Sequence, residues 1–119
     1  MGLRRGSVVI NIVQMHDPNG VNPKANRPLV VVSSNEDIGC NPDTVVCIAI
    51  SKSGSSNYSI TLPWNSTGNV STGLRSPSFA VCDWQVKVPI GNLVEKGRLK
   101  VATLYAVMQK IHELEKSDG

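Results

Sequence analysis

The chain has few of the residues from which disulfide frameworks and metal centres are built. Its 119 residues include three cysteines and two histidines. The cysteines, Cys40, Cys47 and Cys82, are odd in number and form no Cys-x-x-Cys pair, which argues against a disulfide framework and against a zinc site. Cys47 and Cys82 stand inside apolar runs, so we expect buried free thiols in a reducing cytoplasm.

Long hydrophobic runs and a strong charge imbalance are also missing. No apolar stretch approaches the roughly 18 to 20 residues that a membrane-spanning helix needs, so we expect no membrane partner. Twelve Lys and Arg against nine Asp and Glu give a formal net charge of +3. This balance permits a polyanionic partner without demanding one. The sequence has no Ser-His-Asp order, phosphate-binding loop or dinucleotide-binding glycine pattern.

What the sequence does contain is enough for one hydrophobic core. A chain of 119 residues with 40% hydrophobic and 18% charged residues is typical of one folded domain. We expect a single domain over residues 1–116, followed by a frayed tail at 117–119.

The hydrophobic pattern predicts several short strands. Alternating or wholly apolar runs predict strands at residues 7–13, 29–34, 44–50, 58–62 and 79–88. The alternation in the last run places the even-numbered residues from Ala80 to Val88 on one face. Proline, glycine and asparagine predict a long loop over 16–28 and a turn-rich connector over 35–42.

One helix follows the strands. Apolar residues at helical spacing predict a helix over 101–115, with Val101, Leu104, Met108 and Ile111 along one face. Strands followed by a single amphipathic helix predict a mainly β fold. We expect a small, mostly antiparallel barrel or half-open sheet with a C-terminal helix lying on it.

Two of the predicted strands bring polar residues toward one rim of the sheet. Arg27 precedes the run at 29–34, whereas Ser51 and Lys52 follow the run at 44–50. If these strands are antiparallel neighbours, the start of one lies beside the end of the other. An arginine, a hydroxyl and a lysine that converge there suit a phosphate group. The alternative is a surface arginine with an unrelated serine.

Four blocks of the sequence resemble the MazF/PemK-like toxins. The blocks are Arg-Gly-Ser-Val-Val-Ile at 5–10, Asn-Arg-Pro-Leu-Val-Val-Val-Ser at 26–33, Val-Val-Cys-Ile-Ala-Ile-Ser at 45–51 and Pro-Ser-Phe-Ala-Val-Cys-Asp at 77–83. Their order and spacing agree with the family over nearly the whole chain, and Gly-Arg-Leu at 97–99 before the helix resembles the family's ending. The resemblance implies a small SH3-like barrel of the MazF/PemK/CcdB type.

The resemblance also implies an activity. Members are toxins of type II toxin–antitoxin pairs, and they act as homodimeric, sequence-specific endoribonucleases on single-stranded RNA. No metal or other cofactor is needed. The ribose 2′-OH attacks the adjacent phosphorus and leaves a 2′,3′-cyclic phosphate and a 5′-OH. We therefore expect a cytoplasmic toxin whose partners are single-stranded RNA and a cognate antitoxin.

Matching the blocks position by position suggests catalytic residues. Arg27 would stabilise the charge that develops on the phosphate, because arginine is rarely a proton donor. Ser51 would donate a hydrogen bond to the scissile phosphate. Asp83 would be a candidate base, and a carboxylate that pairs with a nearby cation is the alternative interpretation.

Further residues are candidates for substrate binding. Lys24, Lys52 and Lys87 would contact the RNA backbone, and Trp64 would stack on a base because it lies in a polar, loop-rich region. Their alternatives are solvated surface lysines and a tryptophan that caps the core. His16 is a less favoured candidate for the base.

Some family features are absent, and they keep two other functions open. Residues 20–24 contain no histidine, Val81 stands where PemK-type members have an arginine, and Trp84 stands where glutamine follows the aspartate. These departures favour, as an alternative, a catalytically weak or inactive relative that binds RNA or a partner. A CcdB-type gyrase poison is less favoured, because the chain ends Lys-Ser-Asp-Gly and not Trp-Gly-Ile.

Overall fold

Six strands form one antiparallel sheet in the order β4-β5-β3-β2-β1-β6. The computed structural model describes residues 2–14, 25–52 and 57–117. The strands are β1 (Ser7–Asn11), β2 (Arg27–Val31), β3 (Thr44–Ser51), β4 (Ser59–Leu62), β5 (Ser78–Pro89) and β6 (Leu93–Arg98). Helix α1 (Asn35–Gly39), the 3-10 turn η1 (Ile90–Asn92) and helix α2 (Val101–Ser117) complete the fold.

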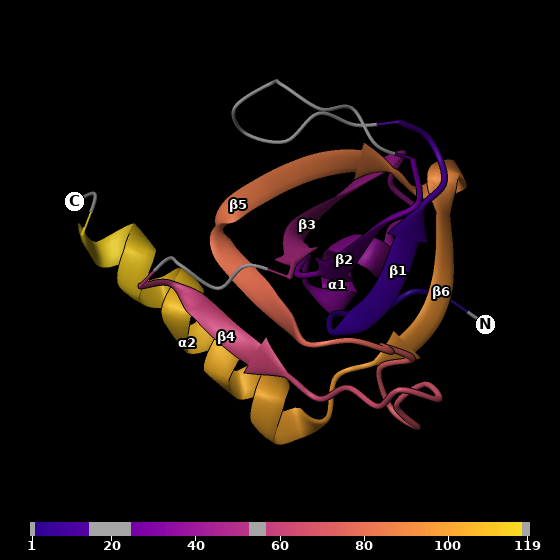
Figure 1. The fold of residues 1–119 in the computed structure, drawn as a ribbon. Coiled ribbons are helices and arrows are strands. Elements are labelled where there is room, and N and C mark those ends of the chain that lie inside the picture. Colours follow the sequence, from indigo (N-terminus) through magenta and orange to yellow (C-terminus); the bar gives the residue numbers. More distant parts are fainter. Residues whose placement is uncertain (1, 15–24, 53–56, 118–119) are drawn as a thin grey trace.

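The mainly β fold with a C-terminal helix is confirmed. Each of the five predicted strands is present, and β5 curves around the central strands while α2 lies beside β4 (Figure 1). Helix α2 ends at Ser117, two residues beyond its predicted end. The narrower prediction of an SH3-like barrel stays a prediction. Within the described residues, no helix is both long and apolar enough to cross a membrane.

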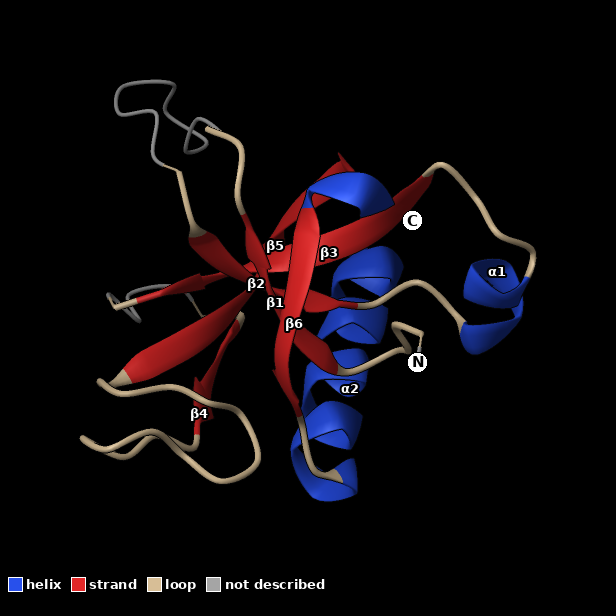
Figure 2. Ribbon diagram, turned by 90° about the vertical axis from the view of Figure 1, so that its right-hand side faces the viewer, coloured by secondary structure: helices blue, strands red, loops and turns tan. Residues whose placement is uncertain are grey.

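Helix α1 and strand β6 were not predicted, and neither was the short turn η1. Helix α1 replaces part of the expected connector. Ser34 is its N-cap, and the Ser34 side chain accepts a hydrogen bond from the Asp37 backbone N–H at 3.1 Å. Strand β6 escapes a search for apolar alternation because it carries Glu95, Lys96 and Arg98. It lies at the edge of the sheet, where charged residues are common. Figure 2 shows α1 standing apart from α2.

Both faces of the central strands are buried. The helix-side cluster contains Val8, Val30, Ile48 and Val107, and the partly buried Leu104, Met108 and Leu114 of α2 pack against it. The opposite cluster contains Val9, Leu29, Val31, Val45, Cys47, Ala49 and Val88. Successive residues of β1, β2 and β3 therefore enter different clusters, as expected when side chains alternate across a sheet. Wholly apolar runs follow from burial on both faces.

Strand β5 crosses from one cluster to the other at a bulge. Ala49 pairs with Val81, but the preceding residue of β3, Ile48, pairs with Gln85. Residues 82–84 are therefore extra on β5, and an odd number of extra residues moves the alternation to the opposite face. The even-numbered residues from 80 to 88 are more buried than their neighbours, as predicted, but they serve two clusters instead of one face.

The packing face of α2 differs in one position from the predicted face. Val107 is fully buried, whereas Val101 in the first turn is 85% exposed. Leu104, Met108 and Ile111 pack on the helix-side cluster as predicted.

The prediction of buried free thiols at Cys47 and Cys82 is confirmed, and Cys40 is exposed. Burial raises the pKa of Cys47 to about 12. Burial, with a smaller contribution from the neighbouring Asp83 carboxylate, raises the pKa of Cys82 to about 11, although Lys110 opposes the shift. Both thiols therefore stay protonated near neutral pH and are poor nucleophiles.

Candidate active site

Strands β2 and β3 are antiparallel neighbours, which is the condition under which the sequence places Arg27 beside Ser51. Leu29 pairs with Ala49, and Val31 pairs with Cys47. The same register, continued by two residues, sets Arg27 opposite Ser51. Odd-numbered residues of both strands enter the opposite cluster, so these two side chains start on the face of the sheet away from α2.

Arg27, Ser51 and Lys52 line one pocket of about 390 Å³. The other lining residues are Ala25, Asn26, Pro28, Ile50, Leu74, Ser76 and Ser78. Among the described residues that line it there are two cations and no carboxylate. The pocket therefore favours an anion, and hydroxyl groups stand beside the cations to donate hydrogen bonds.

Local backbone geometry fixes where Arg27 leaves the loop and joins the sheet. Asn26 has a φ of 60°, a left-handed conformation that asparagine tolerates better than most residues. Arg27 then pairs with Asn11, and Pro28 pairs with Ile10 on β1. The arginine is thus held by the sheet at its backbone, where it lines the pocket.

The indole of Trp84 lies against the Arg27 side chain. The Cζ atom of Arg27 is 5.3 Å from the centroid of the Trp84 ring, within cation–π range. The Nε atom of Arg27 is buried, and the residue lines the pocket. Sequence reasoning missed this contact, because the alternation in β5 does not reveal the bulge at residues 82–84.

The far wall of the pocket comes from the connection between β4 and β5, residues 63–77, and from the start of β5. Leu74 and Ser76 lie in the connection, and Ser78 begins the strand. The Ser78 hydroxyl is buried and donates to the Ser76 carbonyl oxygen at 2.8 Å. The pairing of Ser51 with Phe79 brings this wall to the site. This pairing could have been inferred only if β3 and β5 were known to be neighbours.

The other predicted site residues lie away from this pocket or outside the described residues. Asp83 is exposed at the bulge and does not line the pocket, and Lys87 is exposed further along β5. Trp64 is 44% exposed in the connection between β4 and β5 and is not a lining residue. Lys24 and His16 belong to the segment 15–24, which lies outside the described residues.

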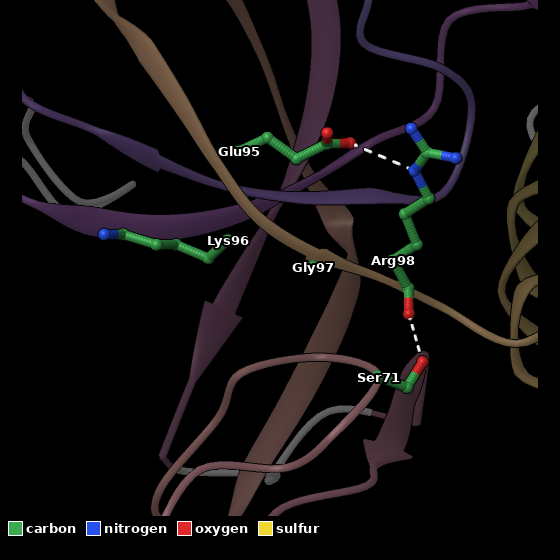
Figure 3. Close-up of a pocket in the computed structure, with 5 residues that line it drawn as sticks. All are labelled: Ser71, Glu95, Lys96, Gly97 and Arg98. Atoms are coloured by element: carbon green, nitrogen blue, oxygen red, sulfur yellow. Dashed lines mark hydrogen bonds and ion pairs between the residues drawn. The ribbon is translucent and has the colours of Figure 1, made fainter. Parts of the chain in front are cut away.

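A second pocket, of about 410 Å³, lies beside β6 and contains a hydrogen-bonded network (Figure 3). The hydroxyl of the fully buried Ser7 donates to the Glu95 carboxylate at 2.5 Å. The Nε atom of Arg98 donates to the same oxygen at 3.3 Å. The Ser71 hydroxyl donates to the Arg98 carbonyl oxygen. Lys96 extends away from Glu95 and Arg98.

This network has a structural role. The backbone N–H of Arg98 donates to the Ser71 carbonyl oxygen at 2.8 Å, which fastens the 63–77 connection to β6. The Glu95 carboxylate compensates the charge of Arg98 and makes the pocket less suitable for an anion than the pocket at Arg27. The β6 network affects the pocket at Arg27 only indirectly. It fastens the 63–77 connection, which carries the lining residues Leu74 and Ser76.

The family model described as "PemK-like, MazF-like toxin of type II toxin-antitoxin system" matches residues 4–114. The chain belongs to this family. The match spans all four sequence blocks, and the resemblance drawn from them is confirmed. No significant match was found among curated proteins.

Solved structures of MazF toxins share the fold. A MazF of Deinococcus radiodurans superposes with a TM-score of 0.71 over 98% of both chains at 13% identity. A MazE–MazF structure from the same organism gives 0.68 over 98% of both chains at 14% identity. A mycobacterial endoribonuclease in complex with its cognate antitoxin gives 0.67 over 96% of this chain and 95% of that chain, at 14% identity. At such identities the likeness shows the fold alone.

Proposed function

We propose that this toxin-family protein is a metal-independent endoribonuclease that cleaves single-stranded mRNA in a sequence-specific manner. The observation that carries the proposal is the pocket in which Arg27, Ser51 and Lys52 meet, and in which none of the described lining residues is acidic. A pocket with this charge at the end of two strands suits one phosphate of a single strand, and its open side leaves room for the flanking nucleotides.

The proposed reaction is a transesterification. The ribose 2′-OH attacks the adjacent phosphorus, a base takes its proton, and the bond from phosphorus to the 5′-oxygen breaks. The 5′-oxygen takes up a proton and leaves as a 5′-OH, while the other product ends in a 2′,3′-cyclic phosphate. The transition state carries extra negative charge on the nonbridging oxygens, and fixed donors aimed at that charge lower the barrier.

Arg27 and Ser51 would supply this stabilisation. The terminal nitrogens of Arg27 would bind the nonbridging oxygens, and the Ser51 hydroxyl would donate to the same phosphate. Lys52 would attract the RNA backbone at the rim. Asp83 remains the candidate base, and its exposed position on β5 means that the RNA would have to extend past the bulge to reach it. Lys24, Lys87 and Trp64 remain candidates for binding the flanking RNA.

The direct test is incubation of the purified protein with a long single-stranded RNA in excess EDTA. We expect discrete fragments with 5′-OH ends. In Ser51→Ala we expect kcat/KM to fall about 10- to 100-fold, because a hydrogen bond to a charged phosphate is lost. Ser51→Thr is the matched control, since it keeps the hydroxyl, and it should cleave at close to the wild-type rate.

Other results would point to the alternatives. RNA that stays intact but shifts in a gel would identify a binding protein without catalytic activity. RNA that is neither cleaved nor bound would argue against the proposal and would direct attention to a gyrase assay. Cleavage that needs a divalent metal ion would also contradict the mechanism given above.

We further propose that a cognate antitoxin neutralises this toxin in the cytoplasm, and that the toxin is a homodimer. Support comes from the family membership and from the neighbour solved with its cognate antitoxin. An acidic, partly disordered antitoxin segment would cover the cationic pocket and order on binding. We expect the antitoxin segment and RNA to compete for binding to the toxin, which a competition binding assay would measure. We expect the toxin to sediment as a dimer, which analytical ultracentrifugation would measure. Simultaneous binding of both ligands at the pocket would contradict this model.

A further inference from the structure

The 63–77 connection between β4 and β5 contains no helix or strand, yet its own hydrogen bonds hold it together. The backbone N–H groups of Asn65 and Asn69 both donate to the Leu74 carbonyl oxygen at 3.0 Å, and Thr72 inside the connection is buried. Connections of this length without secondary structure are uncommon in compact domains and are usually functional. This one therefore presents its exposed side chains from a fixed backbone.

Arg75 is an exposed cation of this connection, and it stands next to the candidate active site. The residues before and after it, Leu74 and Ser76, both line the pocket at Arg27, whereas Arg75 does not. Its Nε atom would lie 3.9 Å from a Cβ atom placed on Gly68, so its side chain lies beside that turn. Among the described residues Arg75 has no hydrogen-bond or ion-pair partner.

The charge around Arg75 favours an anion. Residues 44–82 contain no aspartate or glutamate, and Lys52 and Arg75 are the only lysine and arginine in this stretch. Glu95, in the pocket beside β6, is already paired with Arg98. Lys52 lines the pocket and Arg75 adjoins its far wall, so positive charge continues from the pocket onto the connection. A nucleic-acid strand carries one negative charge at every phosphate, which suits such a continuous surface.

An exposed tryptophan in the same connection distinguishes between two kinds of polyanion. Trp64 is 44% exposed and is followed by Asn65, whose N–H donates to the Leu74 carbonyl oxygen. Trp64 and Arg75 therefore each adjoin one end of the same hydrogen bond. Surfaces that bind single strands combine cations for the backbone with aromatic rings for the bases. An acidic peptide has no base to stack, so this pairing favours RNA.

We propose that Arg75 binds a second phosphate of the single-stranded RNA, beside the phosphate that occupies the pocket at Arg27. This inference rests on the proposed function. The reacting phosphate stays in the pocket, and the RNA continues from there over the 63–77 connection. Arg75 is then a substrate-binding residue that holds the strand equally in the ground state and the transition state, so its loss weakens affinity and leaves the chemical step unchanged.

The test measures binding of an RNA of about eight nucleotides whose 2′-O-methyl groups prevent cleavage. In Arg75→Gln we expect the Kd at low salt to rise about 5-fold, because a hydrogen-bonded contact to a charged phosphate is lost. The plot of log affinity against log salt concentration should become shallower by about 0.7, the value for one contact to a single strand. Arg75→Lys keeps the charge and should keep the wild-type slope.

Arg4→Gln is the matched control for the lost charge, because Arg4 is exposed and its recorded hydrogen bonds are made by its backbone. Its Kd should stay within about twofold of wild type. A 2′-O-methyl dinucleotide has one phosphate and fills only the pocket, so Arg75→Gln and Arg4→Gln should bind it equally. Equal Kd values for the eight-nucleotide RNA would overturn the second phosphate site. So would an equal loss of affinity for both ligands in Arg75→Gln. Thermal unfolding shows whether each variant is folded.

A cleavage assay on the wild-type protein separates failure of this inference from failure of the proposed function. Cleavage together with equal binding by Arg75→Gln and Arg4→Gln would overturn the second phosphate site and leave the nuclease intact. Selective loss of RNA affinity in Arg75→Gln without any cleavage by wild type would support the site and contradict the nuclease. If Arg75→Gln loses affinity for polyglutamate and not for RNA, the connection binds an acidic protein, and the RNA site is wrong.

Discussion

Replacing Arg27 with alanine should reduce cleavage of single-stranded RNA by about a hundred- to a thousandfold in kcat/KM, the loss seen when a donor to a developing oxyanion is removed. Arg27 is the cation that the fold holds most firmly in the pocket. Its backbone pairs with Asn11 in the sheet, its Nε atom is buried, and Trp84 lies against it. Lys52, by contrast, is exposed at the rim and follows the end of β3.

The loss should fall mainly on kcat. Charge on the nonbridging oxygens increases in the transition state, so a donor aimed at them contributes more there than in the bound substrate. Arg27→Lys should recover only part of the rate, because an ammonium group cannot donate two parallel hydrogen bonds and does not stack on Trp84 as a plane. Rates from single-turnover cleavage in EDTA would measure both variants.

Arg4→Ala is the matched control for the loss of one positive charge. Arg4 is exposed, and the hydrogen bonds recorded for it join its backbone to Ser7, so removing its side chain leaves the pocket intact. This variant should cleave within about twofold of wild type, as expected for a single distant, screened surface charge. Equal activity in Arg27→Ala and Arg4→Ala would show that Arg27 is not catalytic.

The proximity of Arg27 and Ser51 could be predicted from the sequence because it depends only on the burial of two strands and on their closeness along the chain. Both runs, 29–34 and 44–50, are apolar enough to be strands buried on both faces, and they are close enough in the chain to be neighbours. The antiparallel pairing of β2 with β3 then brings the start of one to the end of the other. Local pattern and simple topology together located the centre of the candidate site.

Trp84 could not be placed by the same reasoning. A period of two assigns Trp84 to the face of Cys82, and the register shift that separates them appears only when β3 and β5 are paired. The bulge leaves no mark in the hydrophobic pattern, because both faces of the sheet are buried and accept apolar side chains equally well. The same register was needed to bring Ser76 and Ser78 to the pocket.

The missed elements have local explanations. Helix α1 has only five residues, too few for an apolar period to show. Its available signal was Ser34 followed three residues later by Asp37, a pairing that resembles a capping motif. Strand β6 carries charged residues along the edge of the sheet and is held to β1 by backbone pairing. Backbone pairing of this kind cannot be read from side-chain alternation.

Among the glycines that the structure describes, Gly97 should be the least tolerant of a side chain. A Cβ atom at this position would lie 2.2 Å from the Ser71 carbonyl oxygen and 2.8 Å from the Thr72 carbonyl carbon. Both are backbone atoms, so no rotamer change relieves the clash. Thr72 is 1% exposed, and its hydroxyl donates to the Pro63 carbonyl oxygen at 2.9 Å, which prevents the connection from moving aside without losing buried contacts.

We therefore expect Gly97→Ala to lower the free energy of unfolding by about 3 kcal/mol, at the upper end of the cost of overpacking a core. For a domain of this size the unfolding temperature should fall by about 10 °C. Urea and thermal unfolding would measure both quantities. Gly91→Ala is the matched control, because no atom lies within 4 Å of a Cβ at that position, and its effect should stay within about 0.5 kcal/mol.

The same substitution links the β6 network to the candidate active site. If the 63–77 connection is pushed away from β6, Leu74 and Ser76 move with it and the far wall of the pocket opens. Folded Gly97→Ala should then bind uncleavable RNA more weakly than Gly91→Ala does, with KM more affected than kcat because Arg27 and Ser51 keep their places on β2 and β3. If Gly97→Ala unfolds at the same temperature and urea concentration as Gly91→Ala, the 63–77 connection can move aside without cost. Neither the loss of stability nor the weaker RNA binding would then be expected.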